Sequence, residues 1–185
     1  DMQAIATHPE DEPEGLLRIT ASTSFGQAQL TGAVTEFVAR YPKVRIDMQL
    51  LDRTVNLVDE RVDLAIRITN ELDPNLIARR LTTCRSVVCA APSYLKTHVE
   101  PKTIEDLSLH NCLTHSYHGS SLWHFTRNSE PSSVAVSGNV STNDSVTTLQ
   151  AALCGSGVAL LPTYLAAPLV RKGELVALLP DYQPM

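Results

Sequence analysis

The sequence predicts a mixed α/β fold built on a largely parallel sheet. Between residues 16 and 68, short apolar runs of strand length alternate with stretches whose apolar residues recur at helical spacing. The order strand–helix–strand–helix–strand within about fifty residues is typical of βαβ units. The length of 185 residues suits one domain of about 100–200 residues or two closely associated lobes.

Composition and charge narrow the class of protein. With 43% hydrophobic and 19% charged residues, the chain has the composition of an ordinary globular protein. No apolar run approaches the roughly 20 residues that span a bilayer, and residues 1–15 contain no secretory signal. The net charge of −5, with scattered cations, argues against a nucleic-acid-binding face on this chain. We therefore expect a cytoplasmic protein.

The four cysteines are Cys84, Cys89, Cys112 and Cys154, and their spacing forms no CxxC redox or zinc pair. A chain of this length needs no disulfides to fold. Because free cysteine is among the most buried residue types, we expect buried, reduced thiols. A redox-sensing thiol is the alternative.

The first predicted elements follow a solvated, acidic lead-in at residues 8–15. Residues 16–20 have strand length and apolar character. Ser24 and Gln27 stand three apart, as in a capping box, and predict the start of a helix. That helix should end at Pro42, after apolar residues at helical spacing: Leu30, Val34, Phe37, Val38 and Tyr41.

The next segments complete the βαβ pattern. Residues 44–50 alternate apolar and polar side chains, which predicts a half-buried strand. Val55, Val58 and Val62 mark a short helix, and residues 63–68 form a compact apolar strand.

Residues 86–179 predict shorter strands and helices than residues 16–68. Residues 86–91 read as a strand, Pro92 suits a helix start, and residues 103–107 suit another short helix. Three strand candidates follow, at 112–115, 122–127 and 134–141. The last elements are a helix capped by Asn143 and Asp144 that runs to Cys154, a strand at 158–161, a helix from Thr163 to Gly173, and a strand at 175–179.

Motifs for catalysis and metal binding are weak. His110, His115, His118 and His124 fall within fifteen residues. Their spacing matches no zinc motif, and if 112–115 is a strand, Cys112 and His115 face opposite sides. We therefore favour solvated or locally bonded histidines over a metal site. The chain has no GxSxG, HExxH or GxxxxGK[ST] motif. The Gly155–Gly157 turn is better explained as a helix end than as an anion-binding loop, because a strand follows it.

Polar residues cluster where α/β sheets bind ligands, beyond the carboxyl ends of strands. Ser22, Thr23 and Ser24 follow the first strand, and Arg67 ends the third. Asn143 and Asp144 open the late helix. Helix starts present free amides that favour carboxylates. The alternative is that Ser24 and Asn143 only cap their helices.

Seven segments occur in a characteristic order over nearly the whole chain: GLLRITASTSFG, FVARYPKVRIDMQL, DRTVNLVDERVDLAIRI, IARRL…VVCAAPSYL, HNCLTH…LWHF, VSGNVSTNDSVTTLQAALCGSGVALLP and GELVALLP. In this order and spacing they resemble the effector-binding domain of bacterial LysR-type transcriptional regulators. The resemblance implies a two-lobed fold similar to type II periplasmic binding proteins. Two α/β subdomains would be joined by two crossover strands, with an effector in the interlobe cleft.

The resemblance also implies a domain organisation. Residues 1–14 would be a linker remnant, and the family's N-terminal winged helix-turn-helix DNA-binding domain is absent from this chain. Lobe I would comprise 15–88 plus 162–185, and lobe II would comprise 89–161. The crossovers would be residues 86–91 and 158–161. The family's usual continuation beyond the last residues is also missing, which suggests a truncated chain.

The family's ligand contacts, carried over to this sequence, fall at residues 21–24, near Asp52 and Thr54, and at residues 143–146. Together with Arg67 at its strand end and Ser116, they give a candidate effector site. A small organic anion, most simply a carboxylate, would be bound by ten residues: Ser22, Thr23, Ser24, Asp52, Thr54, Arg67, Ser116, Asn143, Asp144 and Val146. Arg67 is the candidate counter-charge, with pairing to Asp52 or Glu71 as the structural alternative. Where the family often has a hydroxyl just before the second helix, this chain has Leu51 or Asp52, and a buried acid there would repel an anion.

The resemblance favours a sensor that controls transcription through DNA bound by the missing domain. A transporter's solute-binding protein shares the fold but would need a signal segment. An enzyme is the third class, and no acid–base pair, nucleophile triad or cofactor motif supports it. We expect no cofactor and no membrane contact. The helix at residues 27–41 should pack on a partner's second lobe in a homodimer, and the full-length protein should form a tetramer.

Overall fold

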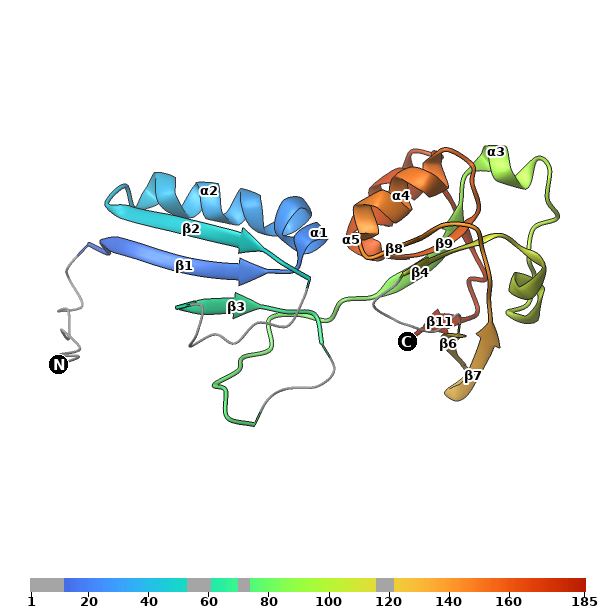
Figure 1. Ribbon diagram of the computed structural model, residues 1–185, viewed down its shortest axis with the longest axis horizontal. Helices are drawn as coiled ribbons and strands as arrows, with labels where there is room; N and C mark the ends of the chain where they lie inside the picture. Colours follow the sequence, from blue (N-terminus) through green and yellow to red (C-terminus); the bar gives the residue numbers. More distant parts are fainter. Residues whose placement is uncertain (1–11, 53–60, 70–73, 116–121) are drawn as a thin grey trace. The chain divides into compact units, whose positions relative to one another are not determined.

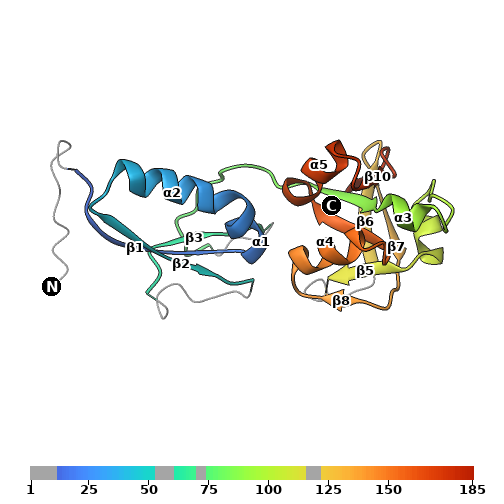
Figure 2. The same cartoon turned by 90° about the horizontal axis from the view of Figure 1, so that it is seen from above.

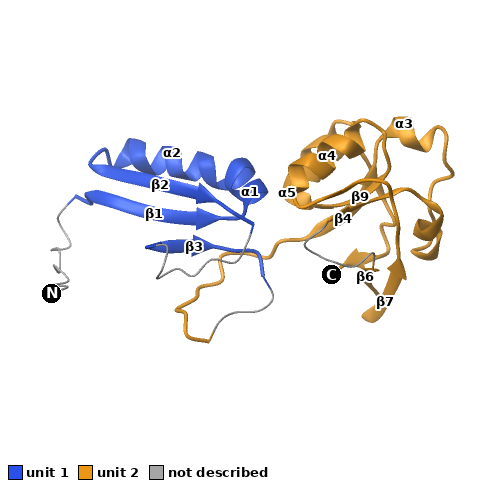
Figure 3. Ribbon diagram, viewed as in Figure 1, with its two compact units in different colours: residues 1–69 blue, residues 70–185 orange. Residues whose placement is uncertain are grey.

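The computed structural model describes residues 12–52, 61–69, 74–115 and 122–185 (Figure 1). The chain divides into two compact units, residues 1–69 and residues 70–185, coloured separately in Figure 3. We call them unit 1 and unit 2 and describe each by itself. Within the ranges given above, no helix is long and apolar enough to cross a membrane.

Unit 1 contains a three-stranded parallel sheet in the order β2-β1-β3. Its strands are β1 (Gly15–Ala21), β2 (Val44–Leu50) and β3 (Leu64–Ile66). The parallel pairing confirms the predicted βαβ arrangement, and the exposure of β2 alternates along the strand as its sequence does. The helix predicted between β2 and β3 lies largely outside the described residues.

One continuous helical stretch connects β1 to β2. It consists of α1 (Thr23–Phe25), the π-helix η1 (Gly26–Leu30) and α2 (Thr31–Arg40). The predicted capping box is wrong. The residue that caps α1 is Ser22, and it makes no side-chain capping bond. Ser24 is buried inside the first turn, where it cannot serve as the helix cap.

Gly26 explains how closely this helix approaches the sheet. A Cβ atom added at Gly26 would lie 2.2 Å from the Cδ2 atom of Leu50 on β2. The helical stretch therefore covers the sheet face that carries Leu50, and a larger residue at position 26 would have to displace the Leu50 side chain. The Thr31 hydroxyl donates to the Gly26 carbonyl at 2.9 Å, across the π-helical turn.

Unit 2 is built on a five-stranded sheet in the order β10-β4-β9-β5-β8. β5 runs parallel to β8 and β9, whereas β4 runs antiparallel to β9 and β10. The strands are β4 (Ser86–Ala90), β5 (Cys112–His115), β8 (Ser141–Thr142), β9 (Val158–Pro162) and β10 (Val176–Leu178).

A separate antiparallel sheet has the order β11-β6-β7. Its strands are β6 (Leu122–Arg127), β7 (Glu130–Ala135) and β11 (Gln183–Pro184). The strand predicted at 134–141 is wrong in its bounds. Asn128 and Ser129 have positive φ angles of 51° and 69°, and such two-residue turns form hairpins. Because the chain turns there, β7 begins at Glu130; it ends at Ala135.

The helices described in unit 2 are α3 (Pro92–Leu95), the 3₁₀ helix η2 (Glu105–Leu109), α4 (Ser145–Leu153) and α5 (Thr163–Arg171) (Figure 2). Of these, η2 contacts β7 of the smaller sheet, and α4 and α5 pack on the larger one. α4 contacts β5 and β9, and α5 contacts β4 and β9. Gly155 and Gly173, with φ of 74° and 73°, end α4 and α5 as predicted.

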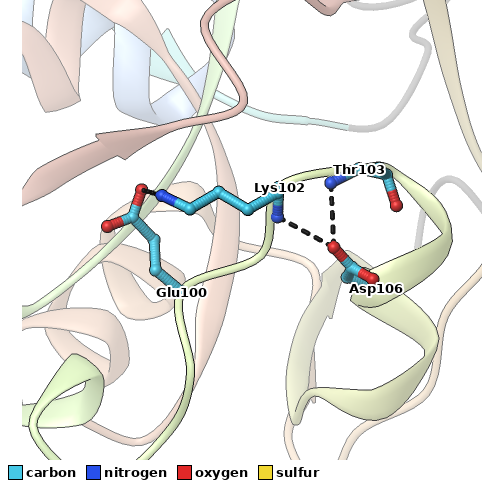
Figure 4. A network of polar contacts seen from close by, with 4 residues as sticks. All are labelled: Glu100, Lys102, Thr103 and Asp106. Atoms are coloured by element: carbon cyan, nitrogen blue, oxygen red, sulfur yellow. Dashed lines mark hydrogen bonds and ion pairs between the residues drawn. The ribbon is translucent and has the colours of Figure 1, made fainter.

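A local network positions η2, whose first residue lies two positions after the predicted start. One carboxylate oxygen of Asp106 accepts hydrogen bonds from the backbone amides of Lys102 at 2.8 Å and Thr103 at 2.9 Å (Figure 4). These bonds hold the pKa of Asp106 below its ordinary value. Lys102 also pairs with Glu100 at 2.8 Å.

The last part of the chain belongs to unit 2. β10 pairs with β4, and α5 packs on β4 and β9. Residues 162–185 were expected in lobe I, and these contacts give that grouping no support; the lobe boundaries stay a prediction. β4 and β9, expected as crossovers between lobes, are neighbours inside the sheet of unit 2.

All four cysteines are free thiols. Cys89 and Cys112 are buried, and burial raises the pKa of each thiol to about 12. Cys84 is half-buried and Cys154 is exposed at the end of α4. The expectation of buried thiols therefore holds for two cysteines and is wrong for Cys154.

Candidate functional site

Unit 1 gathers polar and charged side chains where its three strands end. Ala21 on β1 pairs with Leu50 on β2 and with Ile66 on β3. Because the strands are parallel, the residues that follow these three leave the same edge of the sheet. We call this place the unit 1 edge. It is formed by Thr20, Ser22, Thr23, Ser24, Leu51, Asp52 and Arg67.

Arg67 connects all three strand ends. Arg67 is the residue directly after β3. One of its guanidinium nitrogens donates to the hydroxyl of Thr20, on the central strand β1, at 2.8 Å. The other donates to the backbone carbonyl of Leu51, after β2, at 3.0 Å. Thr20 is only 1% exposed. A half-buried cation is therefore held in a fixed position at the unit 1 edge.

Asp52, which follows β2, bonds to the turn that follows β1. Its Oδ1 atom accepts a hydrogen bond from the backbone amide of Thr23 at 2.9 Å. An amide of the first helical turn, which sequence reasoning assigned to a ligand, is thus bonded to the chain's own carboxylate. Asp52 is exposed, so the repulsion that a buried acid would exert on an anion does not arise from burial here.

Arg67 makes contacts within unit 1 and also lies where a ligand is expected. Its bonds to Thr20 and Leu51 are structural contacts. Glu71, one of the acids proposed as its partner, lies outside the described residues. The structure thus gives Arg67 a role in the scaffold and also places its charge at the edge where a ligand is expected; its role in binding stays a prediction.

Unit 2 has a second polar edge at the start of α4. His115 at the end of β5 pairs with Thr142 at the end of β8. Asp144 caps α4: its Oδ1 atom accepts from the Thr147 amide at 2.6 Å and from the Thr147 hydroxyl at 2.7 Å. The amide of Asp144 in turn donates to the Thr142 hydroxyl at 3.2 Å. The predicted cap is confirmed, with Asp144 as the capping residue.

The structure brings the candidate residues together in two sets. Ser22, Thr23, Ser24, Asp52 and Arg67 lie at the unit 1 edge. Asn143, Asp144 and Val146 lie at the start of α4 in unit 2, where Asn143 is exposed and Val146 half-buried. Thr54 and Ser116 fall outside the described residues.

Sequence reasoning missed two features. The first is Thr20, whose hydroxyl accepts a hydrogen bond from Arg67. The sequence gives no sign of this role, because threonine is common in strands and needs no partner outside them. The second is an aromatic group in unit 2. The ring of Tyr94 stacks on His98 at 4.0 Å, and the Tyr94 hydroxyl lies 3.1 Å from Nδ1 of His110.

The predicted histidine cluster does not form a metal site among the residues that the structure describes, which exclude His118. His110 bonds to Tyr94, as the local-bonding interpretation predicted. Burial lowers the pKa of His110, the charge of His98 lowers it further, and Asp106 raises it.

Comparison with known proteins gives one consistent result. The family model described as the LysR substrate binding domain matches residues 10–185. The chain is 37% identical over 180 residues to the HTH-type transcriptional activator TtdR of Escherichia coli strain K12, covering 95% of this chain and 57% of TtdR. It is 36% identical over 172 residues to the transcriptional regulator DmlR of the same strain, covering 92% of this chain and 56% of DmlR.

A solved structure agrees with these matches. CrgA, a LysR-type transcriptional regulator from Neisseria meningitidis, superposes with a TM-score of 0.82 at 26% identity, covering 93% of this chain and 60% of CrgA. The fold is therefore the two-lobed, periplasmic-binding-protein-like α/β fold of these regulatory domains. This chain spans a little over half the length of TtdR and DmlR. It belongs to the family of LysR substrate-binding domains.

Proposed function

We propose that this chain is the ligand-sensing part of a transcriptional regulator, and that it binds a small organic anion at the unit 1 edge. The observation that supports this most is Arg67, whose guanidinium is held where three parallel strands end. Ligands of α/β sheets bind beyond the carboxyl ends of strands. A guanidinium can bind a carboxylate through two parallel hydrogen bonds.

The neighbouring hydroxyls complete the proposed site. Ser22 is half-buried at the turn after β1, and Thr23 follows it at the first helical position. Ser24 is 7% exposed. Hydroxyl groups both donate and accept hydrogen bonds, so they suit the oxygen atoms of an organic acid. On unit 2, Asn143 and Val146 are the side chains that we propose for ligand contact, because Asp144 is occupied as a helix cap.

The proposed consequence of binding is control of transcription. TtdR is named as a transcriptional activator and DmlR as a transcriptional regulator. We propose that DNA is bound by a part of the whole protein beyond these 185 residues, in the cytoplasm, and that the protein assembles as a homodimer and at full length as a tetramer. An effector can shift such a regulator between states only if it binds one state more tightly.

Membership of the family decides between the functional classes considered from the sequence. The relatives are transcriptional regulators, which argues against a solute-binding protein of a transporter. Regulators of this family are generally not enzymes, and we propose no catalytic role for the unit 1 edge. The proposed role of its side chains is to bind and orient a ligand.

Calorimetry and thermal melting against a panel of small carboxylic acids and their amides would test this proposal. An acid that binds the native state raises the melting temperature, whereas its uncharged amide should not. Arg67→Ala should weaken binding of that acid about ten- to a hundredfold, which corresponds to about 1.5–3 kcal/mol. Arg45→Ala, at an exposed position of β2, is the matched control and should leave affinity unchanged.

Two results would contradict the proposal. If no acid in the panel shifts the melting temperature, the effector is not a small organic anion. If Arg67→Ala lowers the melting temperature but leaves affinity unchanged, Arg67 belongs to the scaffold alone.

A further inference from the structure

We propose a pH-sensitive contact in unit 2: protonation of His110 breaks its bond to the Tyr94 hydroxyl and loosens α3 from the junction of η2 and β5. We call the residues involved the Tyr94 network, which comprises Tyr94, His98, His110 and Asn111. Two histidines contact one tyrosine there, and Tyr94 is only 3% exposed. The network lies wholly within unit 2 and needs no ligand at the unit 1 edge.

Tyr94 connects two parts of unit 2. It belongs to α3, and its hydroxyl oxygen lies 3.1 Å from Nδ1 of His110, the residue directly after η2. The backbone amide of Asn111 donates to the same oxygen at 3.2 Å. Asn111 precedes β5, and its carbonyl accepts from the Val158 amide of β9 at 2.9 Å. One phenolic hydroxyl therefore holds α3 against the point where η2 passes into β5.

The direction of the bond between Tyr94 and His110 follows from the available hydrogens. The Asn111 amide can only donate, so the Tyr94 oxygen accepts this bond and keeps its own hydrogen for another partner. If that hydrogen is donated to Nδ1 of His110, all three groups are paired, and His110 is neutral with its hydrogen on Nε2. A hydrogen on Nδ1 would instead deprive the hydroxyl hydrogen of Tyr94 of this acceptor at a buried residue, which costs free energy. The neutral Nε2–H form of His110 therefore fits the network.

His98 is arranged in the opposite way. Its ring stacks on the ring of Tyr94, with centroids 4.0 Å apart and planes inclined by 8°. Its Nδ1 atom lies 3.1 Å from the backbone carbonyl of Tyr94, which can only accept, so Nδ1 carries the hydrogen. Protonation of His98 on Nε2 keeps both contacts, whereas protonation of His110 on Nδ1 breaks its contact. His110 is therefore the acid-sensitive member of the pair.

Two charged groups near His110 have opposite effects on its protonation. The ring centroids of His98 and His110 are 6.3 Å apart, so a charge on one opposes a charge on the other. Burial lowers the pKa of His110, the charge of His98 lowers it further, and Asp106 raises it. The other titratable groups on the neighbouring elements are Lys96 after α3, Glu105 on η2, the pair Glu100 and Lys102, the buried Cys112 on β5, and Glu130 at the exposed start of β7.

The lowered pKa of His110 determines in which direction pH acts. A histidine whose pKa is lowered in the folded state stabilises that state above its ordinary pKa of about 6.5. This contribution is lost as pH falls toward the lowered pKa. The Tyr94 network should therefore be closed at pH 7 and open more often at pH 5. The apolar cluster that contains Tyr94 keeps the rest of unit 2 folded.

Nuclear magnetic resonance of histidine side chains labelled with nitrogen-15 tests the direction of the bond. At about pH 7.5, the neutral ring of His110 should carry its hydrogen on Nε2, and the neutral ring of His98 should carry it on Nδ1. The variants His110→Gln and His98→Gln assign the signals. An Nδ1–H form of His110 at this pH would overturn the proposal.

Tyr94→Phe removes the hydroxyl and keeps the ring that stacks on His98. The neutral form of His110 then loses a hydrogen bond, so the pKa of His110 should rise. Tyr182→Phe is the matched control, because its hydroxyl accepts from Arg127 in the same unit at 3.1 Å. This control should leave the pKa of His110 unchanged. If Tyr94→Phe does not fold, the wild type and His110→Gln still decide the question.

Hydrogen exchange of backbone amides measures the opening itself. In the wild type, protection of the Asn111 amide should fall at least about threefold between pH 7 and pH 5, after correction for the intrinsic exchange rate. Protection of the Cys154 amide, which donates to the carbonyl of Gln150 at 3.0 Å, should change less than this. In His110→Gln the glutamine oxygen can accept from Tyr94 and does not titrate. Protection of Asn111 in this variant should therefore not depend on pH.

Two further outcomes count against the Tyr94 network as a pH-sensitive contact. Equal protection of Asn111 at pH 7 and pH 5 in the wild type means that the contact does not open. A fall in protection that persists in His110→Gln means that another group titrates. An unchanged pKa of His110 in a folded Tyr94→Phe variant likewise removes the tyrosine from the explanation.

Discussion

Unit 1 and unit 2 are stabilised in different ways. Unit 2 contains two buried apolar clusters, and the larger is centred on residues such as Phe125, Ile104 and Leu107. In the described part of unit 1, the buried hydrophobic residues are Ile19 and Ala21, and α2 buries none of its residues.

The two units also differ in where their buried polar residues lie. Thr20 and Ser24 are buried in unit 1, and both belong to the unit 1 edge. Thr20 anchors Arg67. Two buried residues of unit 1 are therefore also residues of its candidate ligand site.

In unit 2 the buried polar residue is Thr148, whose hydroxyl donates to the carbonyl of Asp144, and the next residue of α4, Leu149, belongs to the smaller apolar cluster. Substitutions at Thr20 and Ser24 should therefore change both stability and ligand binding, whereas substitutions inside the apolar clusters of unit 2 should act mainly on stability.

The largest expected difference comes from truncating one phenylalanine in each unit. Phe125 is fully buried on β6, and Phe125→Ala should lower the free energy of unfolding by about 3–5 kcal/mol. Phe37 on α2 is 39% exposed, and Phe37→Ala should cost about 1 kcal/mol or less. Denaturation followed by circular dichroism measures both. Equal losses would mean that unit 1 has a core comparable to that of unit 2.

Two glycines give the next largest contrast. A Cβ atom at Gly138 would lie 1.9 Å from the carbonyl oxygen of Cys112, so Gly138→Ala should destabilise unit 2 by about 1–3 kcal/mol. Gly32 in α2 has nothing within 4 Å of such an atom. Gly32→Ala should stabilise unit 1 by up to about 1 kcal/mol, because alanine favours the helix. Thermal melts of the two variants should shift in opposite directions.

Removing the cap of α4 should have an intermediate effect. Asp144→Ala eliminates both bonds to Thr147 and should cost about 1 kcal/mol. Asp144→Ser should recover part of this loss, since serine also caps helices. A loss equal in both variants, measured by urea denaturation, would show that the charge rather than the capping bond stabilises α4.

The smallest expected effect is a pH dependence in unit 2. Burial, and then His98, lower the pKa of His110, while Asp106 opposes them. A histidine whose folded-state pKa is lowered contributes stability above its ordinary pKa of about 6.5 and loses it as pH falls through the lowered pKa. The melting temperature should therefore fall slightly between pH 7 and pH 5. His110→Gln should flatten this slope, and His124→Gln, at an exposed position of β6, should not.

The sequence predicted correctly those strands and helices that are marked by a local pattern of residues. The alternation in residues 44–50 identified β2, and Asp144 with Gly155 bounded α4 correctly. The helix start after β1 was predicted wrongly, because the carboxylate bonded to its amide comes from Asp52, 29 residues away. A local pattern cannot reveal a partner at that separation.

Long-range pairing explains the other differences. Arg67 was recognised as a charge at a strand end, but its bond to Thr20 spans 47 positions of the sequence. The grouping of residues 163–185 with unit 2 depends on the pairing of β10 with β4, across 86 positions for Val176 and Ala90 (176 − 90 = 86). The hairpin turn at Asn128 was missed because Asn-Ser is a weaker turn signal than Asn-Gly.

The π-helix η1 gives unit 1 tolerance to changes in chain length. A π-helical turn holds one residue more than an α-helical turn, so it absorbs an extra residue without rotating the helix beyond it. Deleting one residue from Gly26–Leu30 would turn this segment into ordinary α-helix while leaving the faces of α2 in place. Related chains that differ by one residue here can keep the same helix direction and the same strand ends.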